Sequence, residues 1–338
     1  MQSSVSRLRP WRRRLIVSIG IIASALAIYA VGPRSALDLE RTQPTPAIPP
    51  IEALDAWIAR EEAPYPTLVA GAEKRIVWAG APGERTPLAI IYLHGYTATR
   101  QEVAPLCEQL AASLGANLYH TRLHGHGLEP EALGAASGED WLRDAAEALA
   151  IGRTLGERVI VIGTSTGGTL ALWLAQQKNA ESIAALLLIS PNLGPRNRQG
   201  ELLAGPWGAE LLSLLVGETY EWQPANDAQR RYWTWRYPAK ALLPMMALVR
   251  EVRGSALESI RVPTWVLYSP DDQVVHPAEI EQAFSRLGSP FKALEALPEA
   301  QDRSRHVLAG DILAPQDTSR VLERMQRFLS RIDLTTNS

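Results

Sequence analysis

One serine in this chain stands where its side chain could act as a nucleophile. Ser165 is the centre of Gly163-Thr164-Ser165-Thr166-Gly167, a G-x-S-x-G sequence between a β-branched apolar run and a helical pattern. A sharp strand-to-helix turn brings two backbones together, and glycines two positions either side of its apex leave room for the crossing. The apex residue is strained, and its hydroxyl is exposed at a helix N-terminus. Such a serine can attack a carbonyl, and helix-terminal N–H groups can stabilise the resulting oxyanion.

The pentapeptide alone is a weak signal, because Gly and Ser are common in turns. The alternative is an ordinary glycine-rich turn, or one that cradles a phosphate. No lysine follows Ser165 at the spacing of a phosphate-binding loop. The strand and helix that flank the turn therefore favour the nucleophile.

A serine nucleophile needs a base, and the sequence offers six histidines. His306 lies in a loop after the last predicted strand, where an imidazole could reach the top of a sheet. In enzymes with this turn, the acid and then the histidine follow the serine along the chain, and His306 fits that order. His276 lies only four residues after Asp272, on the same loop. The other four histidines precede the serine, namely His94, His120, His124 and His126. We expect His94 to hold its own loop by a side-chain hydrogen bond.

The acid that orients the base should lie in a loop after an intervening strand. Ser269-Pro270-Asp271-Asp272-Gln273-Val274-Val275 is that loop, and its two aspartates compete. We favour Asp272, because the two valines that follow would anchor the turn and direct its carboxylate inward. Asp271 would then be solvated or cap a turn, and the sequence leaves this choice open.

Two backbone N–H groups are candidates for the oxyanion hole. One belongs to Thr166, the residue after the nucleophile, and the other to Tyr96, in the loop His94-Gly95-Tyr96 that follows an earlier strand. Each such donor is typically worth about 10²–10³ in rate.

Alternating strands and helices are predicted to position these residues. Buried strands alternate with helical patterns on both sides of the serine turn, which predicts a mostly parallel central sheet flanked by helices, an α/β fold. The predicted strands are Arg75–Ala79, Leu88–Leu93, Asn117–Leu123, Arg158–Gly163, Ile183–Ser190, Thr264–Ser269 and Phe291–Leu297. The predicted helices are Ile51–Arg60, Gln101–Leu114, Ser137–Arg153, Thr169–Gln177, Ala278–Leu287 and Ser319–Ile332.

The alternation breaks between Pro191 and Glu258. This segment has several helical pieces rich in Trp, Tyr and Met and no clear strand, and it predicts a helical cap at about residues 192–260. Its aromatic residues would line an apolar acyl pocket or form a small helical core.

The N-terminus has two parts. Five arginines, the last of them Arg14, precede the uncharged run Leu15–Val31. We expect residues 1–32 to be a single-pass anchor in a bacterial inner membrane, with the catalytic domain outside the cytoplasm. The alternative is a signal sequence cleaved near Ala25-Leu26-Ala27, which would leave a secreted or periplasmic protein. Residues 33–50 are Pro-rich and predict a linker, and residues 51–335 predict the folded domain.

Composition excludes several other kinds of protein. The 338 residues are 46% hydrophobic with a net charge of −2, so nucleic acid is not an expected partner. The single cysteine, Cys107, can form no internal disulfide, and no Cys/His cluster suggests a metal site. We expect no metal or organic cofactor, and the oligomeric state is not predicted.

Several motifs together resemble the α/β-hydrolase superfamily, and within it bacterial carboxylesterases and monoglyceride-lipase or serine-aminopeptidase-like hydrolases. The likeness covers roughly Ile76–Leu329, and the motifs fall in the family's order: L-H-G-Y-T-A-T at 93–99, H-G-H-G at 124–127, G-T-S-T-G-G at 163–168, S-P-D-D-Q-V-V at 269–275 and S-R-H-V-L at 304–308. The N-terminus and the cap depart from the pattern.

The resemblance implies Ser165 as nucleophile, Asp272 as acid, His306 as base, and Tyr96 and Thr166 as oxyanion residues. It implies hydrolysis of carboxylic esters through an acyl-enzyme, with an acyl ester or monoacylglycerol as substrate. A thioesterase, amidase or acyltransferase with the same triad is an alternative. A catalytically inactive binding module on this scaffold is an alternative of another class.

Overall fold

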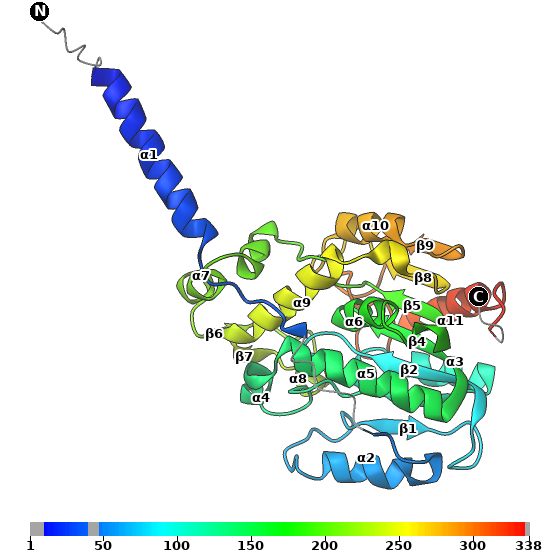
Figure 1. The fold of residues 1–338 in the computed structure, drawn as a ribbon. Helices are drawn as coiled ribbons and strands as arrows, with labels where there is room; N and C mark the ends of the chain where they lie inside the picture. The colour runs from blue at the N-terminus through cyan, green and yellow to red at the C-terminus, as the bar shows by residue number, and fades with distance from the viewer. Residues whose placement is uncertain (1–9, 40–46, 335–338) are drawn as a thin grey trace, which may run out of the picture.

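The computed structural model describes residues 10–39 and 47–334 (Figure 1). The arginines at positions 7 and 9, part of the expected linker and the expected end of the folded domain at 335 lie outside the described residues.

A seven-stranded sheet forms the centre of the molecule, with the strand order β1-β3-β2-β4-β5-β8-β9. Neighbouring strands are parallel except β1, which runs antiparallel to β3. The prediction of a mostly parallel sheet is therefore confirmed. The strands are β1 (Arg75–Val77), β2 (Thr86–Leu93), β3 (Asn117–His120), β4 (Gly156–Thr164), β5 (Ile183–Ile189), β8 (Thr264–Tyr268) and β9 (Lys292–Ala296).

Helices cover both faces of the sheet (Figure 1). Alternate residues of a strand point to opposite faces, so Ile91 and Val161 belong to one buried cluster, and Ile90 and Ile162 belong to the other. The first cluster includes residues of α5 (Gly138–Leu155), α6 (Thr166–Leu174) and α10 (Pro277–Arg286), and the second includes residues of α3 (Leu106–Leu114) and α11 (Pro315–Leu329). The helix α2 (Leu54–Glu62) precedes β1.

Local sequence explains where α5 begins. The Ser137 side chain accepts a hydrogen bond from the backbone N–H of Asp140, and the Asp140 side chain accepts one from the backbone N–H of Ser137. This is the capping box that the spacing of the two residues predicts.

The segment between β5 and β8 forms the cap. It contains α7 (Gly208–Leu215), α8 (Asp227–Tyr232) and α9 (Leu242–Gly254), and it packs beside α4 (Pro130–Ala135). It also contains the antiparallel pair β6 (Thr219–Glu221) and β7 (Arg236–Pro238), so the expectation of no strand here was wrong. Each strand has three residues and β6 is exposed throughout, so the pair lacks the alternating apolar pattern that identifies a strand in sequence.

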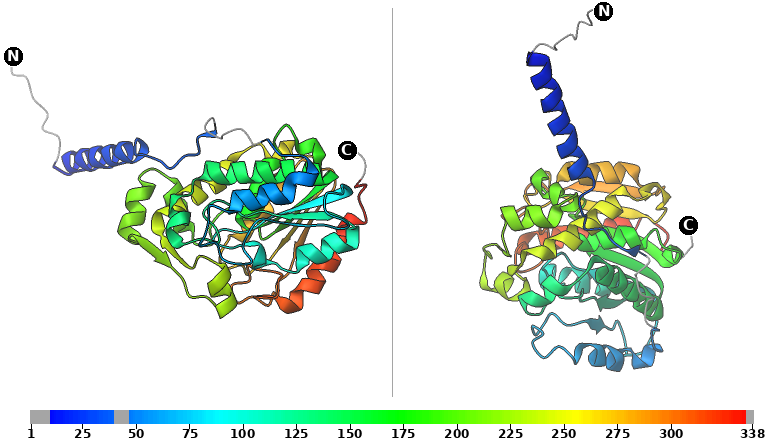
Figure 2. Two further views of the ribbon diagram at one scale, coloured as in Figure 1. Left: turned by 90° about the horizontal axis from the view of Figure 1, so that it is seen from below. Right: turned by 60° about the vertical axis from the view of Figure 1, so that its left-hand side comes forward.

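The N-terminal helix α1 (Pro10–Ala30) extends away from the rest of the chain (Figures 1 and 2). Among the described residues, no helix combines the length and apolar character needed to cross a bilayer. The expected single-pass membrane anchor, and the location inferred from it, are therefore contradicted. The first turn of α1 contains arginines, so the uncharged part of the helix is Leu15–Ala30. This part is about 24 Å long, which is shorter than the hydrocarbon core of a bilayer at about 30 Å.

The end of α1 and the residues after it contact the body of the protein. The Trp207 backbone N–H donates to the Pro33 carbonyl at 2.7 Å, and its indole N–H donates to the Ile28 carbonyl at 3.1 Å. The Asp38 backbone N–H donates to Glu139 Oε1 at 2.6 Å. Part of the segment expected to be a linker therefore lies against the cap and the start of α5, while the domain boundaries stay a prediction.

Candidate active site

Ser165 is the single residue between β4 and α6, and its backbone is strained as the spacing predicts. Its φ and ψ angles are 53° and −118°, which a non-glycine residue rarely adopts. A Cβ atom on Gly167 would lie 1.9 Å from the Leu93 carbonyl oxygen, and one on Gly163 would lie 2.5 Å from the Gly167 carbonyl oxygen. The turn can form only because both positions lack a side chain.

The end of β5 holds both Ser165 and His306. The Ser165 backbone N–H donates to the Ile189 carbonyl at 2.9 Å, and the hydroxyl of the next residue, Ser190, donates to the His306 carbonyl at 2.8 Å. The Ser165 carbonyl in turn accepts from the Asn192 backbone N–H at 2.9 Å. The serine turn and the histidine loop, 141 positions apart in sequence, are thus fixed to two adjacent residues.

His306 and Asp272 form a buried pair. The distance from His306 Nδ1 to Asp272 Oδ2 is 2.7 Å, and the exposed fractions are 6% for His306 and 0% for Asp272. The other carboxylate oxygen of Asp272 accepts from the backbone N–H groups of Val274 at 2.7 Å and Val275 at 2.9 Å. The structure thus places Asp272 beside the imidazole, whereas Asp271 is exposed.

Only one of the two valines after Asp272 anchors the turn by packing, whereas we expected both to do so. Val275 is buried, but Val274 is 47% exposed, so the two valines do not both anchor the turn by packing. Their backbone N–H groups orient the carboxylate instead. His276, four residues further along this loop, immediately precedes α10. Its backbone N–H donates to the Gly194 carbonyl at 2.9 Å.

Asp302 supports the loop that carries His306, and sequence reasoning missed it. Its Oδ2 atom accepts from the backbone N–H groups of His306 and Val307, both at 3.1 Å, and from the Ser304 hydroxyl. A carboxylate that precedes a loop histidine by four residues was the available signal, since aspartate side chains commonly bond the backbone a few residues on.

The pKa of His306 reflects opposing influences. Burial acts to lower it, but the negative charges of Asp272, Glu102 and Asp302 favour the imidazolium, and together they raise the pKa above its ordinary value. Asp272 also fixes the tautomer, because its carboxylate accepts a hydrogen bond from the Nδ1–H group and so leaves Nε2 unprotonated and able to accept a proton.

Two neutral histidines shape the loop that contains Tyr96. The Thr97 backbone N–H donates to His126 Nε2 at 3.1 Å, and Thr97 has a positive φ of 66°. His94 contacts its own loop through Nδ1 and accepts from the Leu123 backbone N–H at 3.1 Å, as we expected of it. Burial lowers the pKa of His94 to about 4 and that of His126 well below its ordinary value, so both can act as acceptors at neutral pH.

The Tyr96 ring is packed edge-on against aromatic neighbours. Its centroid lies 5.8 Å from that of Trp141 and 5.7 Å from that of Tyr237 in the cap. The loop that carries this ring lies next to the serine turn, since a Cβ atom on Gly95 would be 3.2 Å from Ser165 Cβ. Thr166 is the first residue of α6, where backbone N–H groups have no acceptor within the helix. The assignment of the Tyr96 and Thr166 N–H groups as oxyanion donors stays a prediction.

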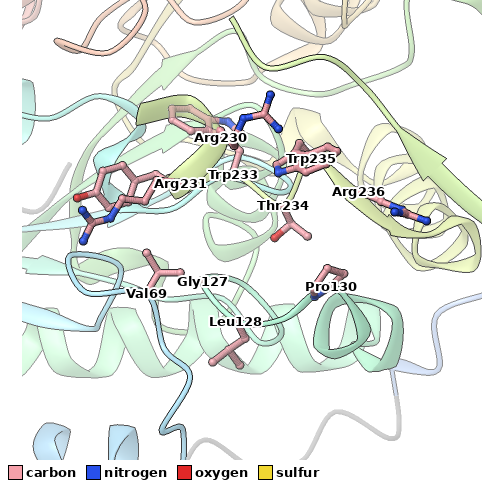
Figure 3. A pocket seen from close by; sticks show the side chains of 11 residues that line it. Val69, Gly127, Leu128, Pro130, Arg230, Arg231, Trp233, Thr234, Trp235 and Arg236 are labelled. Atoms are coloured by element: carbon pink, nitrogen blue, oxygen red, sulfur yellow. The ribbon is translucent and has the colours of Figure 1, made fainter. Parts of the chain in front are cut away.

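A cavity of about 310 Å³ lies between the cap and the loop after His126 (Figure 3). The Thr234 backbone N–H donates to the Thr97 carbonyl at 2.8 Å, so one wall of the cavity is joined to the Tyr96 loop. Neither Ser165 nor His306 lines it. Its lining residues are Val69, Gly127, Leu128, Pro130, Arg230, Arg231, Tyr232, Trp233, Thr234, Trp235 and Arg236.

Comparison with known sequences gives a match over most of the chain. The model of the family described as serine aminopeptidase, S33, matches residues 85–308, a range that contains Tyr96, Ser165, Asp272 and His306. A thermostable monoacylglycerol lipase from Bacillus sp. (strain H-257) is 27% identical over 241 residues, which are 71% of this chain and 91% of that protein.

Comparison with solved structures shows the same fold. A structure from the work on LipS and LipT, two metagenome-derived lipolytic enzymes, has a TM-score of 0.62 with 22% identity, and the match covers 78% of this chain and 99% of that one. A soluble variant of the monoglyceride lipase from Saccharomyces cerevisiae has a TM-score of 0.60 with 16% identity, and covers 78% of this chain and 92% of that one.

Proposed function

The chain belongs to the serine aminopeptidase S33 family of α/β-hydrolases, and on that premise we propose that it is a serine hydrolase that cleaves carboxylic esters. The observation that carries this proposal is the buried pair of His306 and Asp272, 2.7 Å apart, in which the loop of His306 is bonded to the same end of β5 as Ser165. The strained backbone of Ser165 supports a nucleophile at this position.

In the proposed acylation step, Ser165 Oγ attacks the ester carbonyl carbon while His306 Nε2 takes the hydroxyl proton. Asp272 holds the imidazole in the tautomer that can accept this proton and stabilises the imidazolium that forms. The backbone N–H groups of Tyr96 and Thr166 donate to the oxyanion. When the tetrahedral intermediate collapses, His306 returns the proton to the leaving alcohol, and the acyl group stays on Ser165.

In the proposed deacylation step, a water molecule takes the place of the alcohol. His306 removes a proton from this water as its oxygen attacks the acyl carbonyl carbon, and then gives the proton back to Ser165 Oγ. The carboxylic acid leaves, and the free enzyme is restored.

We propose an acyl ester or a monoacylglycerol as the substrate, within a domain of residues 51–335 whose cap spans about 192–260. The Bacillus relative, a monoacylglycerol lipase, supports this substrate class. The cap supports it through buried apolar side chains such as Met245 and Tyr237, which give this end of the sheet an apolar covering.

Labelling with a fluorophosphonate probe tests the nucleophile. The wild-type protein should be labelled and should hydrolyse p-nitrophenyl octanoate, and Ser165→Ala should do neither. Labelling that persists in Ser165→Ala, or a wild-type protein inert towards both reagents, would contradict the proposal. Hydrolysis rates for acetyl and octanoyl esters test the acyl preference, and product analysis with an added alcohol separates a hydrolase from an acyltransferase.

A further inference from the structure

Glu102 is a buried carboxylate to which the mechanism above gives no role. It ends the short 3-10 helix Arg100–Glu102, and 2% of it is exposed. Its Oε2 atom accepts hydrogen bonds from the Gly95 backbone N–H at 2.8 Å and from the Tyr92 hydroxyl at 2.9 Å. Both donors are uncharged, so neither supplies the opposite charge that a buried carboxylate ordinarily requires.

This carboxylate lies beside the serine. A Cβ atom built on Gly95 would be 2.7 Å from Glu102 Oε1 and 3.2 Å from Ser165 Cβ, so the two side chains approach the same side of Gly95. Gly95 immediately precedes Tyr96, the proposed oxyanion donor. Glu102 thus contacts the oxyanion loop through Oε2, on the side of Gly95 where the Ser165 side chain also lies.

The charged groups near Glu102 on its own segment are engaged elsewhere. Arg100 pairs with Glu73 at 3.1 Å, and Glu108 on α3 pairs with His120 at 3.0 Å. The thiol of Cys107 is neutral, because burial raises its pKa well above its ordinary value. The positive charge of His306 acts to lower the pKa of Glu102.

We propose that Glu102 is a second acidic positioning residue of the active site. Through the Gly95 N–H it holds the oxyanion loop, and its negative charge acts with that of Asp272 to stabilise the His306 imidazolium while Ser165 attacks. Glu102 itself neither gains nor loses a proton, because the proton passes only between Ser165, His306 and the leaving alcohol. This inference rests on the proposed function.

The raised pKa of His306 is in the direction that this coupling requires, because the charge of Glu102 is one of the influences that raise it. Burial raises the pKa of Glu102, while the Gly95 N–H, the Tyr92 hydroxyl and the charge of His306 oppose that rise. The charges of three acidic groups on different elements act to raise the pKa of His306, namely Asp272 after β8, Asp302 on its own loop and Glu102 after β2. Glu102 is the one of these three that also contacts the oxyanion loop.

The substitution Glu102→Gln isolates the charge. Both hydrogen bonds end on Oε2, so the single amide oxygen of glutamine can accept both while the negative charge is lost. We expect the acidic limb of kcat/KM for p-nitrophenyl octanoate to move to lower pH by about one unit, and kcat on the plateau to fall about tenfold. KM should change little, because the charge acts in the transition state.

Glu108→Gln is the matched control. It removes a nearby carboxylate that pairs with His120 and not with His306. Its acidic limb should coincide with that of the wild type. If Glu102→Gln is folded and labelled by the fluorophosphonate but its acidic limb also coincides with the wild type, Glu102 has no electrostatic role and the inference is wrong. A wild-type protein that is neither labelled nor active would instead refute the proposed function.

A second measurement keeps Glu102 in place, in case Glu102→Gln does not fold. In Ser165→Ala labelled with ¹⁵N-histidine and with ¹³C at the glutamate carboxyl carbons, the His306 ring should show an inflection at the same pH as the carboxyl of Glu102, which glutamate labelling separates from the aspartates. A His306 titration with no inflection at that pH would overturn the inference.

Discussion

Asp272 accepts a hydrogen bond from His306 Nδ1 across 2.7 Å, although 34 positions separate the two residues in sequence. The pair is buried, and its carboxylate is held by two further backbone N–H groups. This relationship decides which nitrogen of His306 can act as a base.

The first prediction concerns pH. Burial acts to lower the pKa of His306, but the surrounding carboxylates raise it overall, and the base must be neutral to accept a proton. Activity should therefore be lost on acidification at a higher pH than an ordinary imidazole would give. Asp272→Asn should move this acidic limb to lower pH and reduce kcat by about 10⁴. Asp271→Asn, which changes the exposed neighbour, should leave both the limb and kcat unchanged in a pH series of kcat/KM.

The second prediction concerns the histidine loop. Asp302→Ala removes the acceptor for the His306 and Val307 backbone N–H groups, so the imidazole should shift relative to Ser165. We expect kcat to fall about 10- to 100-fold with little change in KM, because positioning errors near 1 Å cost about this much. Asp302→Asn keeps an oxygen acceptor and should recover most of the rate. Equal losses in the two variants would argue against a positioning role.

The third prediction concerns the serine turn. Gly167→Ala would place a methyl group against the Leu93 carbonyl oxygen, and rigid backbone cannot move aside. We expect the variant to be insoluble or to lose most of its thermal stability. Gly254→Ala is the control, because a Cβ atom there has nothing within 4 Å, and it should be neutral or stabilising by up to about 1 kcal/mol. Thermal melts of both proteins test this, and a Gly167→Ala melt near that of the wild type would contradict it.

The fourth prediction concerns a buried carboxylate outside the site. Burial raises the pKa of Asp144 to about 7, although its carboxylate accepts the His124 backbone N–H at 2.5 Å. Between about pH 4 and pH 7, Asp144 is therefore protonated in the folded state and ionised in the unfolded state. As the pH rises through this range, Asp144 lowers the free energy of unfolding. Asp144→Asn should raise the melting temperature at pH 8 much more than at pH 4, with a gain of at most about 4 kcal/mol.

Asp140 on the same helix supplies a control of opposite sign. Burial acts to raise its pKa, but the hydrogen bonds from Ser137 and the charges of His124 and Arg143 lower it overall. It therefore contributes stability above its unfolded-state pKa, which is lost on acidification. Asp140→Asn should destabilise the protein at pH 8 and much less at pH 3. The same pH trend in both variants would show that these two carboxylates do not act as proposed.

The sequence by itself determined the features that neighbouring residues impose. The glycines around Ser165 specify a strained turn, because no other residue fits where two backbones cross. The spacing of Ser137 and Asp140 specifies where α5 begins, and the alternation of apolar runs with helical patterns specifies a mostly parallel sheet. Short exposed strands such as Thr219–Glu221 were not predicted, because they lack the alternation of apolar and polar residues that identifies a strand.

Tertiary structure decided what depends on contacts between distant residues. The order of the strands places the loops after β5, β8 and β9 together, and this contact selects Asp272 over Asp271 as the neighbour of His306. It also brings Glu102 to the Ser165 turn, and no local pattern marks that residue as part of a site. The reason is physical: steric limits act between neighbours in the chain, whereas the burial and pairing of a charge depend on whichever segments the sheet assembles around it.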